Sequence, residues 1–176
     1  MKIDALCQPI RLILSDVDGV LTDGGIIFDN EGIETKRFFV RDGLGIALWR
    51  RAGYQFGILT GRTSHIVKVR ADELGVDVVR QGCEDKLPVA TELMEQFGLT
   101  AEQICYIGDD LPDLPVMRLV ALGVAVADAT AEVRQSADHV TQARGGHGAV
   151  REIIEKILGV QRRWDAMIQR YTGDGK

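Results

Sequence analysis

Short apolar segments alternate with helix-like segments along almost the whole chain, and this alternation constrains the fold more than any other feature. The apolar segments are continuous runs, which are typical of strands buried on both faces of a parallel sheet. Strands that alternate with helices predict an α/β fold in which right-handed crossovers place helices on both faces of the sheet. The predicted strands are residues 11–18, 54–61, 76–82, 103–110 and 121–128.

Helical segments fill most of the intervals between these strands, and glycines such as Gly53, Gly75 and Gly98 end several of them. One interval differs, because residues 24–39 contain two alternating segments around a turn and predict an inserted β-hairpin. The expected fold is therefore a Rossmann-like, three-layer α/β fold with a parallel sheet and an inserted hairpin. The predicted helices are residues 43–53, 64–75, 84–97, 114–120, 131–137 and 149–171, the last with a break at Gly159.

The length of 176 residues suits a single domain, residues 1–176, with one core. The net charge of -5 and the lack of a basic run argue against a nucleic-acid partner. Cys7, Cys83 and Cys105 are widely spaced without a CxxC motif, so we expect reduced thiols and no zinc site. No apolar run approaches the ~20 residues of a membrane helix. We expect a cytoplasmic protein without a membrane partner and with a flexible tail at about 172–176.

Polar residues follow four of the five predicted strands. Parallel strands bring their carboxyl ends to one edge of the sheet, where ligands bind in folds of this class. Taken singly, each of these polar residues could equally be a helix cap or a turn residue. Their occurrence at corresponding positions predicts one shared site. The residues are Asp16 and Asp18, Thr60 with Gly61 and Arg62, Lys86, and Asp109 with Asp110 and Asp113.

Carboxylates crowd this predicted site, and without a counter-ion they would repel one another by a few kcal/mol. Oxygen ligands with no histidine or cysteine among them favour Mg²⁺. Mg²⁺ beside a lysine and a hydroxyl suits phosphoryl transfer, because Lys86 and Thr60 can hold phosphoryl oxygens. One aspartate can then act as the nucleophile, and a second aspartate two residues further on can donate and accept a proton.

Four segments together resemble the haloacid dehalogenase superfamily of phosphohydrolases, in the order of its four motifs. The resemblance implies that Asp16 forms an aspartyl-phosphate and that Asp18 is the general acid and base. It also implies that Thr60 and Lys86 hold the phosphoryl group. The segments are S-D-V-D-G-V-L-T-D from Ser15, I-L-T-G-R from Ile58, Lys86, and G-D-D-L-P-D from Gly108.

The same resemblance implies the metal ligands. Mg²⁺ would be held by the side chains of Asp16 and Asp109 and by the backbone carbonyl of Asp18. Asp110 and Asp113 would support these ligands without being the primary ones.

Members of this superfamily usually carry a cap domain over the site, but this chain has no space for one. The hairpin and a helix fill the interval between Asp18 and Thr60, and a helix and a strand fill that between Lys86 and Asp109. Either the substrate is a macromolecule or a neighbouring subunit forms the lid. The hairpin, at about 24–39, is more apolar than an exposed ribbon should be. It either folds back on its own sheet or, as we favour, joins copies of the chain into a homo-oligomer.

Further segments, T-D-G, F-F-V-R-D-G-L-G-I and A-R-G-G-H-G-A-V-R-E, resemble the capless branch of the superfamily that dephosphorylates sugar acids. This branch implies a tetramer and a small phosphorylated sugar acid as the substrate. The substrate carboxylate calls for arginines, and Arg62 and Arg70 are the candidates. Related nine-carbon phosphatases tend to carry an acidic residue at the position of Arg62, so we favour an eight-carbon substrate over a nine-carbon one. Arg144 or Arg151 would reach the site of a neighbouring subunit.

A rival class is the bacterial receiver domain, a signalling module that also gathers acids, a threonine and a lysine at the ends of its strands. Receivers present an acid pair, then a lone aspartate, then threonine and lysine. In this chain the threonine directly follows the first acid pair, and a second acid pair comes last. Turnover of a phosphate ester, as opposed to slow autophosphorylation alone, separates the two classes.

Overall fold

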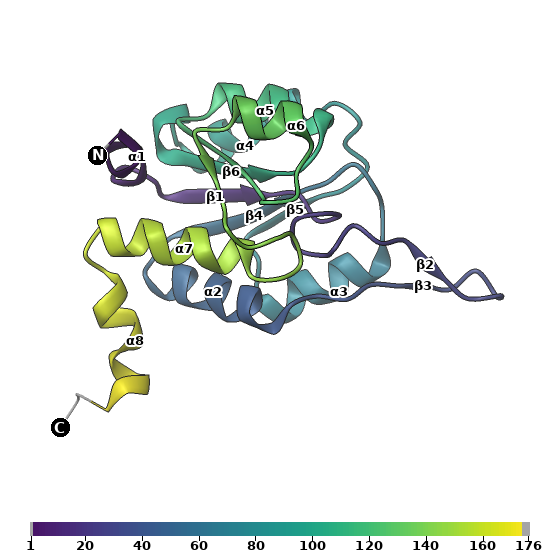
Figure 1. Ribbon diagram of the computed structural model, residues 1–176, viewed down its shortest axis with the longest axis horizontal. Helices are drawn as coiled ribbons and strands as arrows, with labels where there is room; N and C mark the ends of the chain where they lie inside the picture. The colour runs from purple at the N-terminus through teal and green to yellow at the C-terminus, as the bar shows by residue number, and fades with distance from the viewer. Residues whose placement is uncertain (1, 174–176) are drawn as a thin grey trace.

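The structure is a computed structural model that describes residues 2–173, and it has three layers, with a parallel sheet between two layers of helices (Figure 1). Among the described residues the main sheet has six strands in the order β5-β4-β1-β6-β7-β8, all of them parallel. The predicted fold class is therefore confirmed. The strands of this sheet are β1 (Leu12–Ser15), β4 (Gln55–Leu59), β5 (Val78–Arg80), β6 (Ile104–Gly108), β7 (Leu122–Ala125) and β8 (His139–Val140).

Helices cover both faces of the sheet, with α2, α3 and α7 on one face and α4, α5 and α6 on the other (Figure 1). None of the helices within residues 2–173 is long and apolar enough to cross a membrane. The α-helices are α1 (Lys2–Cys7), α2 (Val40–Arg51), α3 (His65–Leu74), α4 (Lys86–Phe97), α5 (Leu114–Leu119), α6 (Ala131–Ser136), α7 (Ala149–Val160) and α8 (Trp164–Thr172), and short 3₁₀ turns are η1 (Ala101–Gln103) and η2 (Leu111–Asp113).

Strand β1 lies at the centre of the sheet, between β4 and β6. Its residues Leu12, Ile13 and Leu14 are fully buried because helices cover both faces, which explains the continuous apolar run in the sequence. Asp16 follows directly, and its backbone N–H donates to the carbonyl of Ile107 in β6 at 3.0 Å. The chain therefore leaves the core at the edge where β4 and β6 also end, and this places the polar residues of three strands together.

The predicted hairpin forms from β2 (Ile27–Phe28) and β3 (Glu34–Thr35), which pair in antiparallel fashion. It extends away from the three layers (Figure 1). The residues Ile27, Phe28 and Ile33 are 52%, 56% and 57% exposed. The hairpin therefore does not fold back on its own sheet, and its apolar side chains are left uncovered by the rest of the chain.

The structure departs from the sequence-based prediction near the chain ends. The short elements α1 and β8 were not predicted. Gly159 lies inside α7, and the break comes at residues 161–163, where Arg162 has a φ of 57°. One glycine weakens a helix by only about 1 kcal/mol, which burial of the neighbouring α7 side chains offsets. Thr172, expected in the flexible tail, belongs to α8, while residues 174–176 of that tail lie outside the described residues.

Candidate active site

The carboxyl ends of β1, β4 and β6 and the start of α4 surround an open pocket of about 340 Å³. Most of the predicted site residues line it, so the structure brings them together as the argument from the strand ends expects. Gly24, Ile26 and Pro112 complete the lining. The predicted residues in the lining are Asp16, Asp18, Thr60, Gly61, Arg62, Lys86, Asp109 and Asp110.

Asp16 and Lys86 form a buried ion pair in this pocket, with Lys86 Nζ 2.9 Å from Asp16 Oδ2. The other Asp16 oxygen accepts a hydrogen bond from the backbone N–H of Val17 at 2.7 Å. Lys86 is the first residue of α4, because the Asp85 carboxylate caps this helix by accepting from the backbone N–H of Leu87. The cap therefore determines where the helix begins and points the lysine at the end of β1.

Burial and the nearby Asp113 raise the pKa of Asp16, while Lys86 acts in the opposite direction. Burial by itself would lower the pKa of Lys86, but Asp113 and Asp16 outweigh that effect and raise this pKa above its ordinary value. Lys86 therefore carries its positive charge at neutral pH. A phosphoryl oxygen that enters the pocket would meet this fixed cation.

Asp113 organises the site from behind. Its Oδ1 accepts from Lys86 Nζ at 2.6 Å and from the Tyr106 hydroxyl at 2.7 Å. Its Oδ2 accepts from the backbone N–H groups of Asp109 and Asp110, at 2.9 and 3.2 Å. A side chain at Gly108 would overlap Asp113, so only glycine fits there. Because both Asp113 oxygens are taken and the residue is buried, we assign it a supporting position.

Asp109 has the opposite character, since its Oδ1 is buried and has no hydrogen-bond partner among the described residues. Burial, Asp113 and Asp16 raise the pKa of Asp109 to about 8. Its carboxylate lies so close to Gly19, which has a φ of 90°, that a side chain at that glycine would overlap it. The loop after β1 is thus built around a carboxylate whose buried Oδ1 has no hydrogen-bond partner within residues 2–173.

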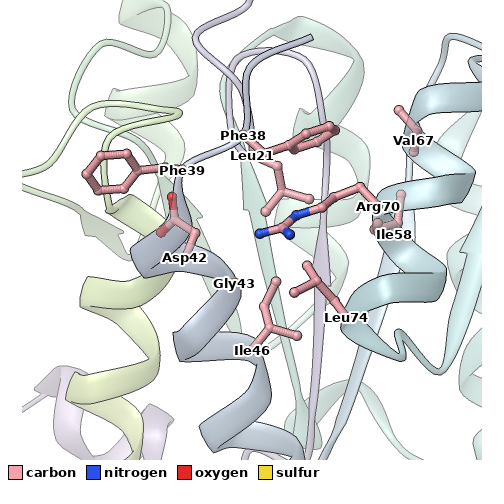
Figure 2. A pocket seen from close by; sticks show the side chains of 10 residues that line it. All are labelled: Leu21, Phe38, Phe39, Asp42, Gly43, Ile46, Ile58, Val67, Arg70 and Leu74. Carbon is pink, nitrogen blue, oxygen red and sulfur yellow. The ribbon is translucent and has the colours of Figure 1, made fainter.

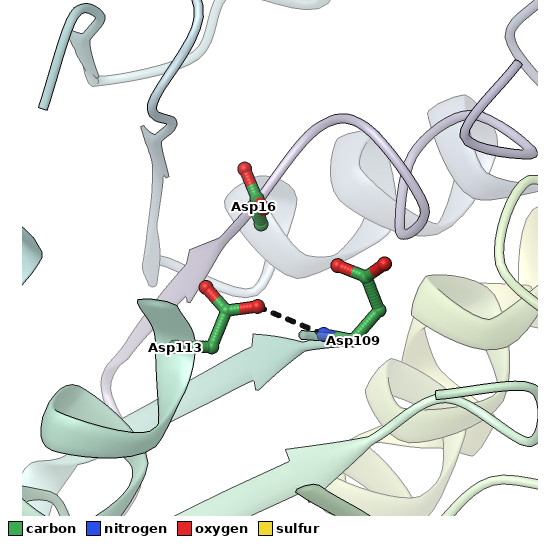
Figure 3. A group of neighbouring side chains, drawn as sticks. All are labelled: Asp16, Asp109 and Asp113. Carbon is green, nitrogen blue, oxygen red and sulfur yellow. Dashed lines mark hydrogen bonds between the residues drawn. The ribbon is translucent and has the colours of Figure 1, made fainter. Parts of the chain in front are cut away.

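Oxygens of Asp16, Asp109 and Asp113 lie within 4.8 Å of one another. Asp16 and Asp109 follow the ends of β1 and β6, and Asp113 lies beside them on the turn η2 (Figure 3). A hard divalent cation fits this group, because the ligands are all carboxylate oxygens and one of them is buried without a partner. Asp109 has the freer carboxylate, since the Asp16 oxygens contact Lys86 Nζ and the Val17 N–H. Asp16 and Asp109 both line the pocket and Asp113 does not, so the geometry suits Asp16 and Asp109 as the ligands. Mg²⁺ is the ion that this donor set favours.

Thr60 and Gly61 follow β4 and border the pocket next to Lys86. The Thr60 backbone is held on both sides, since its N–H donates to the Arg80 carbonyl and its carbonyl accepts from Cys83. Asp110 is exposed, and its carboxylate caps η2 by accepting from the backbone N–H of Leu111 at 2.8 Å. The predicted supporting position of Asp110 is therefore mainly that of a cap in this structure.

Asp18 lies in an ionic network that the sequence analysis missed. Its Oδ1 pairs with Lys36 Nζ, and its Oδ2 lies 3.6 Å from Arg62 Nε. Glu34 in β3 joins the two cations and also accepts from the Ser64 hydroxyl at 2.6 Å. None of the sequence motifs includes Lys36, Glu34 or Ser64. Only the tertiary structure brings these residues close to Asp18.

Arg70, a predicted substrate contact, does not line the pocket that contains Asp16. It lies between α2 and α3 in a small apolar pocket, where its guanidinium is 5.9 Å from the ring of Phe38 (Figure 2). Its Nη1 pairs with Glu73 at 2.7 Å. Gly43 provides the space, because a side chain at that position would overlap the guanidinium.

Arg144 and Arg151, which were expected to reach the site of a neighbouring subunit, do not line the pocket of their own chain. Arg151 pairs with Glu155 in α7 and lies 5.0 Å from the ring of Trp164. Arg144 is exposed at the start of the glycine-rich segment. That segment packs on the first active-site loop, since the N–H of Gly146 donates to the carbonyl of Val20 at 2.8 Å. Its contact with the site in this chain is therefore through backbone.

The chain matches a known family over part of its length and known proteins over most of its length. The haloacid dehalogenase-like hydrolase family matches residues 68–153. The 3-deoxy-D-manno-octulosonate 8-phosphate phosphatase of Escherichia coli strain K12 is 44% identical over 161 residues, which cover 92% of this chain and 86% of that protein. The phosphatase of the same name from Haemophilus influenzae is 44% identical over 154 residues, covering 88% of this chain and 86% of that one.

Solved structures show the same similarity. A crystal structure of 3-deoxy-D-manno-octulosonate 8-phosphate phosphatase from Moraxella catarrhalis, in complex with a magnesium ion, a phosphate ion and a KDO molecule, is 42% identical with a TM-score of 0.95. The match covers 97% of this chain and 98% of that one. A probable phosphatase from Pseudomonas syringae is 44% identical with a TM-score of 0.95 and 97% coverage of both chains.

Proposed function

The chain belongs to the haloacid dehalogenase-like hydrolases, and on this basis we propose that it is a magnesium-dependent phosphomonoesterase. Its substrate would be 3-deoxy-D-manno-octulosonate 8-phosphate, which it hydrolyses to the free sugar acid and phosphate. The observation that carries the proposal is the pair Asp16 and Asp109 beside the buried cation of Lys86. The reaction would serve lipopolysaccharide biosynthesis in the cytoplasm.

The residues present suit a bound Mg²⁺. Asp16 and Asp109 would hold it through their side chains and Asp18 through its backbone carbonyl. Asp113 would keep Lys86 and the backbone of Asp109 in place, as its hydrogen bonds indicate. When bound, the ion neutralises the crowded carboxylates and stabilises charge on the phosphoryl oxygens.

In the proposed reaction an oxygen of Asp16 attacks phosphorus, and the bond from phosphorus to the sugar oxygen breaks. Asp18 donates a proton to the departing sugar alkoxide. A water molecule then attacks the aspartyl-phosphate while Asp18 accepts its proton, which regenerates Asp16 and releases phosphate. Lys86 and Thr60 hold the phosphoryl oxygens through both steps.

Substrate selection would rest on Arg62, which lines the pocket and has a side chain that is 45% exposed. A guanidinium can bind the sugar-acid carboxylate with two parallel hydrogen bonds. Gly61, next to Arg62, also lines the pocket. We leave Arg70 out of the proposed contacts, because its guanidinium packs on Phe38 outside this pocket.

We also propose that the chain works as a homo-oligomer, a tetramer formed through the hairpin at about 24–39. The exposed apolar side chains of Ile27, Phe28 and Ile33 support this, because apolar side chains that cluster on a surface mark interaction sites. Closed association of identical chains would also cover the open pocket from the side of a neighbouring subunit.

The test is phosphate release with and without Mg²⁺ from a panel of esters. The panel holds the eight-carbon and nine-carbon sugar-acid phosphates, simple sugar phosphates and an oligonucleotide with a 3′-phosphate. We expect strong preference for the eight-carbon compound, and preference for the nine-carbon compound would select that alternative. Broad, weak turnover would retain a phosphatase and reject the substrate.

The matched variant for this assay is Asp16→Asn, which keeps the shape of the side chain and removes the nucleophile. We expect its turnover to fall to background while its circular dichroism spectrum stays unchanged. Retained turnover in this variant would reject the mechanism. Slow phosphate uptake from a phosphodonor without any ester turnover in the unmodified chain would favour the receiver-like class.

A further inference from the structure

One lysine outside the sequence motifs is buried against the active site. Lys36 follows β3 at the base of the hairpin, and its side chain is only 1% exposed. Its ammonium group pairs with Asp18 Oδ1 and lies 3.4 Å from Glu34 Oε1. Removing an ammonium group from water is costly, and such an ion pair adds little stability compared with well-packed apolar side chains. Stability alone therefore does not account for a lysine at this position.

Glu34 holds this lysine in register with the rest of the site. Its carboxylate accepts from Arg62 Nη2 at 2.8 Å and from the Ser64 hydroxyl at 2.6 Å, on the segment that follows β4. The hairpin is thus tied to the body of the molecule by the same group that contacts Lys36. Two cations and two carboxylates form a balanced network, and two of its members, Asp18 and Arg62, line the pocket.

We propose that Lys36 is a positioning residue for Asp18. By pairing with Oδ1, the ammonium group fixes the side-chain torsion of Asp18. Oδ2, which lies 3.6 Å from Arg62 Nε, is then the oxygen that transfers the proton to the leaving group. A carboxylate held in one orientation transfers a proton more effectively than one that rotates freely. The inference rests on the proposed function, because it assigns Asp18 the proton transfer described above.

Esters that differ in their leaving group separate this role from a structural one. A sugar alkoxide needs a proton to depart, whereas the nitrophenolate ion of para-nitrophenyl phosphate does not. The parameter kcat/KM covers the steps up to loss of the leaving group. For Lys36→Met we expect kcat/KM to fall by about tenfold or more with sugar phosphates and to stay within about threefold with para-nitrophenyl phosphate.

The panel needs a third ester, because Lys36 could instead contact the substrate carboxylate. A neutral hexose phosphate has a poor leaving group but no carboxylate. We expect its kcat/KM to fall together with that of the sugar-acid phosphate. A loss confined to the sugar-acid phosphate would overturn the positioning role, and so would an equal loss with all three esters.

The matched control is Arg37→Met, which removes the neighbouring cation in the segment that follows β3. Arg37 has a side chain that is 70% exposed and pairs with Asp23 instead of Asp18. We expect its kcat/KM to stay within about twofold for all three esters. Lys36→Arg keeps a cation and should recover part of the loss with sugar phosphates.

If Lys36→Met does not fold, Glu34→Gln provides the test, because it loosens Lys36 without removing its charge. We expect a smaller loss of kcat/KM with the same dependence on the leaving group. A double variant adds an independent check. In the Asp18→Asn background, Lys36→Met should cause no further loss with sugar phosphates, and additive losses would overturn the inference. An unmodified chain that turns over no ester would reject the proposed function itself, whereas an active chain with an equal loss for all esters rejects only the role of Lys36.

Discussion

At the scale of single residues, Asp113 shows how one side chain can organise a site without lining its pocket. It is 1% exposed and joins Lys86, the Tyr106 hydroxyl and the backbone of Asp109. Lys86 has only Asp16 as its other ionic partner in the described part of the chain. The geometry of the cation in the pocket therefore depends on a carboxylate behind it.

The stability of the protein should depend strongly on this residue. Asp113→Ala leaves the Lys86 ammonium and the Tyr106 hydroxyl short of a buried partner. We expect the free energy of unfolding to fall by about 3–5 kcal/mol, the range typical of removing one member of a buried ion pair. Urea unfolding followed by circular dichroism measures it. Asp72→Asn, an exposed change on α3, should stay within about 0.5 kcal/mol, and a similarly small effect of Asp113→Ala would contradict the assigned role.

At the scale of elements, the hairpin carries side chains of two different kinds. Its tip carries apolar side chains with no cover from this chain, including Phe28 and Ile33. Glu34, which pairs with Phe28 across the ladder, and Lys36, which follows β3, point their side chains back to the body, where they contact Ser64 and Asp18. An assembly that holds the tip would therefore also hold the base in place beside the active site.

Association of the chains should be sensitive to the tip of the hairpin. We expect Phe28→Ser with Ile33→Thr to shift the protein toward the monomer, because both changes remove exposed apolar surface without touching the core. Sedimentation velocity across a concentration series measures the shift. Val69→Thr is the control, since Val69 is 53% exposed on α3 away from the hairpin. An unchanged oligomer in the double variant, or a monomeric unmodified chain, would reject hairpin-mediated association.

At the scale of the whole molecule, the cluster of three carboxylates links metal binding to the stability of the fold. Asp16, Asp109 and Asp113 bring three carboxylates together, and the pKa of Asp109 is raised to about 8 because its ionised form is disfavoured by burial and by its neighbours. An ion that binds only the folded chain stabilises it according to its concentration and affinity. The metal-free protein is therefore held below the stability that the same fold has with the ion bound.

Thermal unfolding should show how much stability Mg²⁺ adds to the folded chain. We expect Mg²⁺ to raise the Tm of the unmodified chain. Asp109→Asn should raise the Tm of the metal-free protein by about 2–4 °C, because folding no longer has to bury a carboxyl group whose ionised form is disfavoured there, and it should abolish most of the shift caused by Mg²⁺. Calorimetry with EDTA or with Mg²⁺ measures both values. Asp72→Asn should keep the full shift, and an equally large shift in Asp109→Asn would remove Asp109 from the metal ligands.

The sequence by itself determined the architecture and the inner part of the candidate site. Continuous apolar runs predict buried parallel strands, and residues at the carboxyl ends of such strands must meet at one edge. Asp16, Thr60, Lys86 and Asp109 were therefore predictable, since each lies within a few residues of an element end. The positions of the strand ends follow from the local hydrophobic pattern, so the sequence alone is enough to place these residues.

Only the tertiary structure decided the contacts between segments that are distant in sequence. The burial of Lys36 against Asp18 depends on where the hairpin leaves the body, and no periodicity encodes that direction. Arg70 lies two turns along α3 from the loop after β4, yet its guanidinium packs against the Phe38 ring. The guanidinium fits there because Gly43 has no side chain to overlap it. Side-chain direction and long-range charge pairing follow from packing of the whole chain, whereas element type follows from local pattern, and this is why the two kinds of prediction differ in outcome.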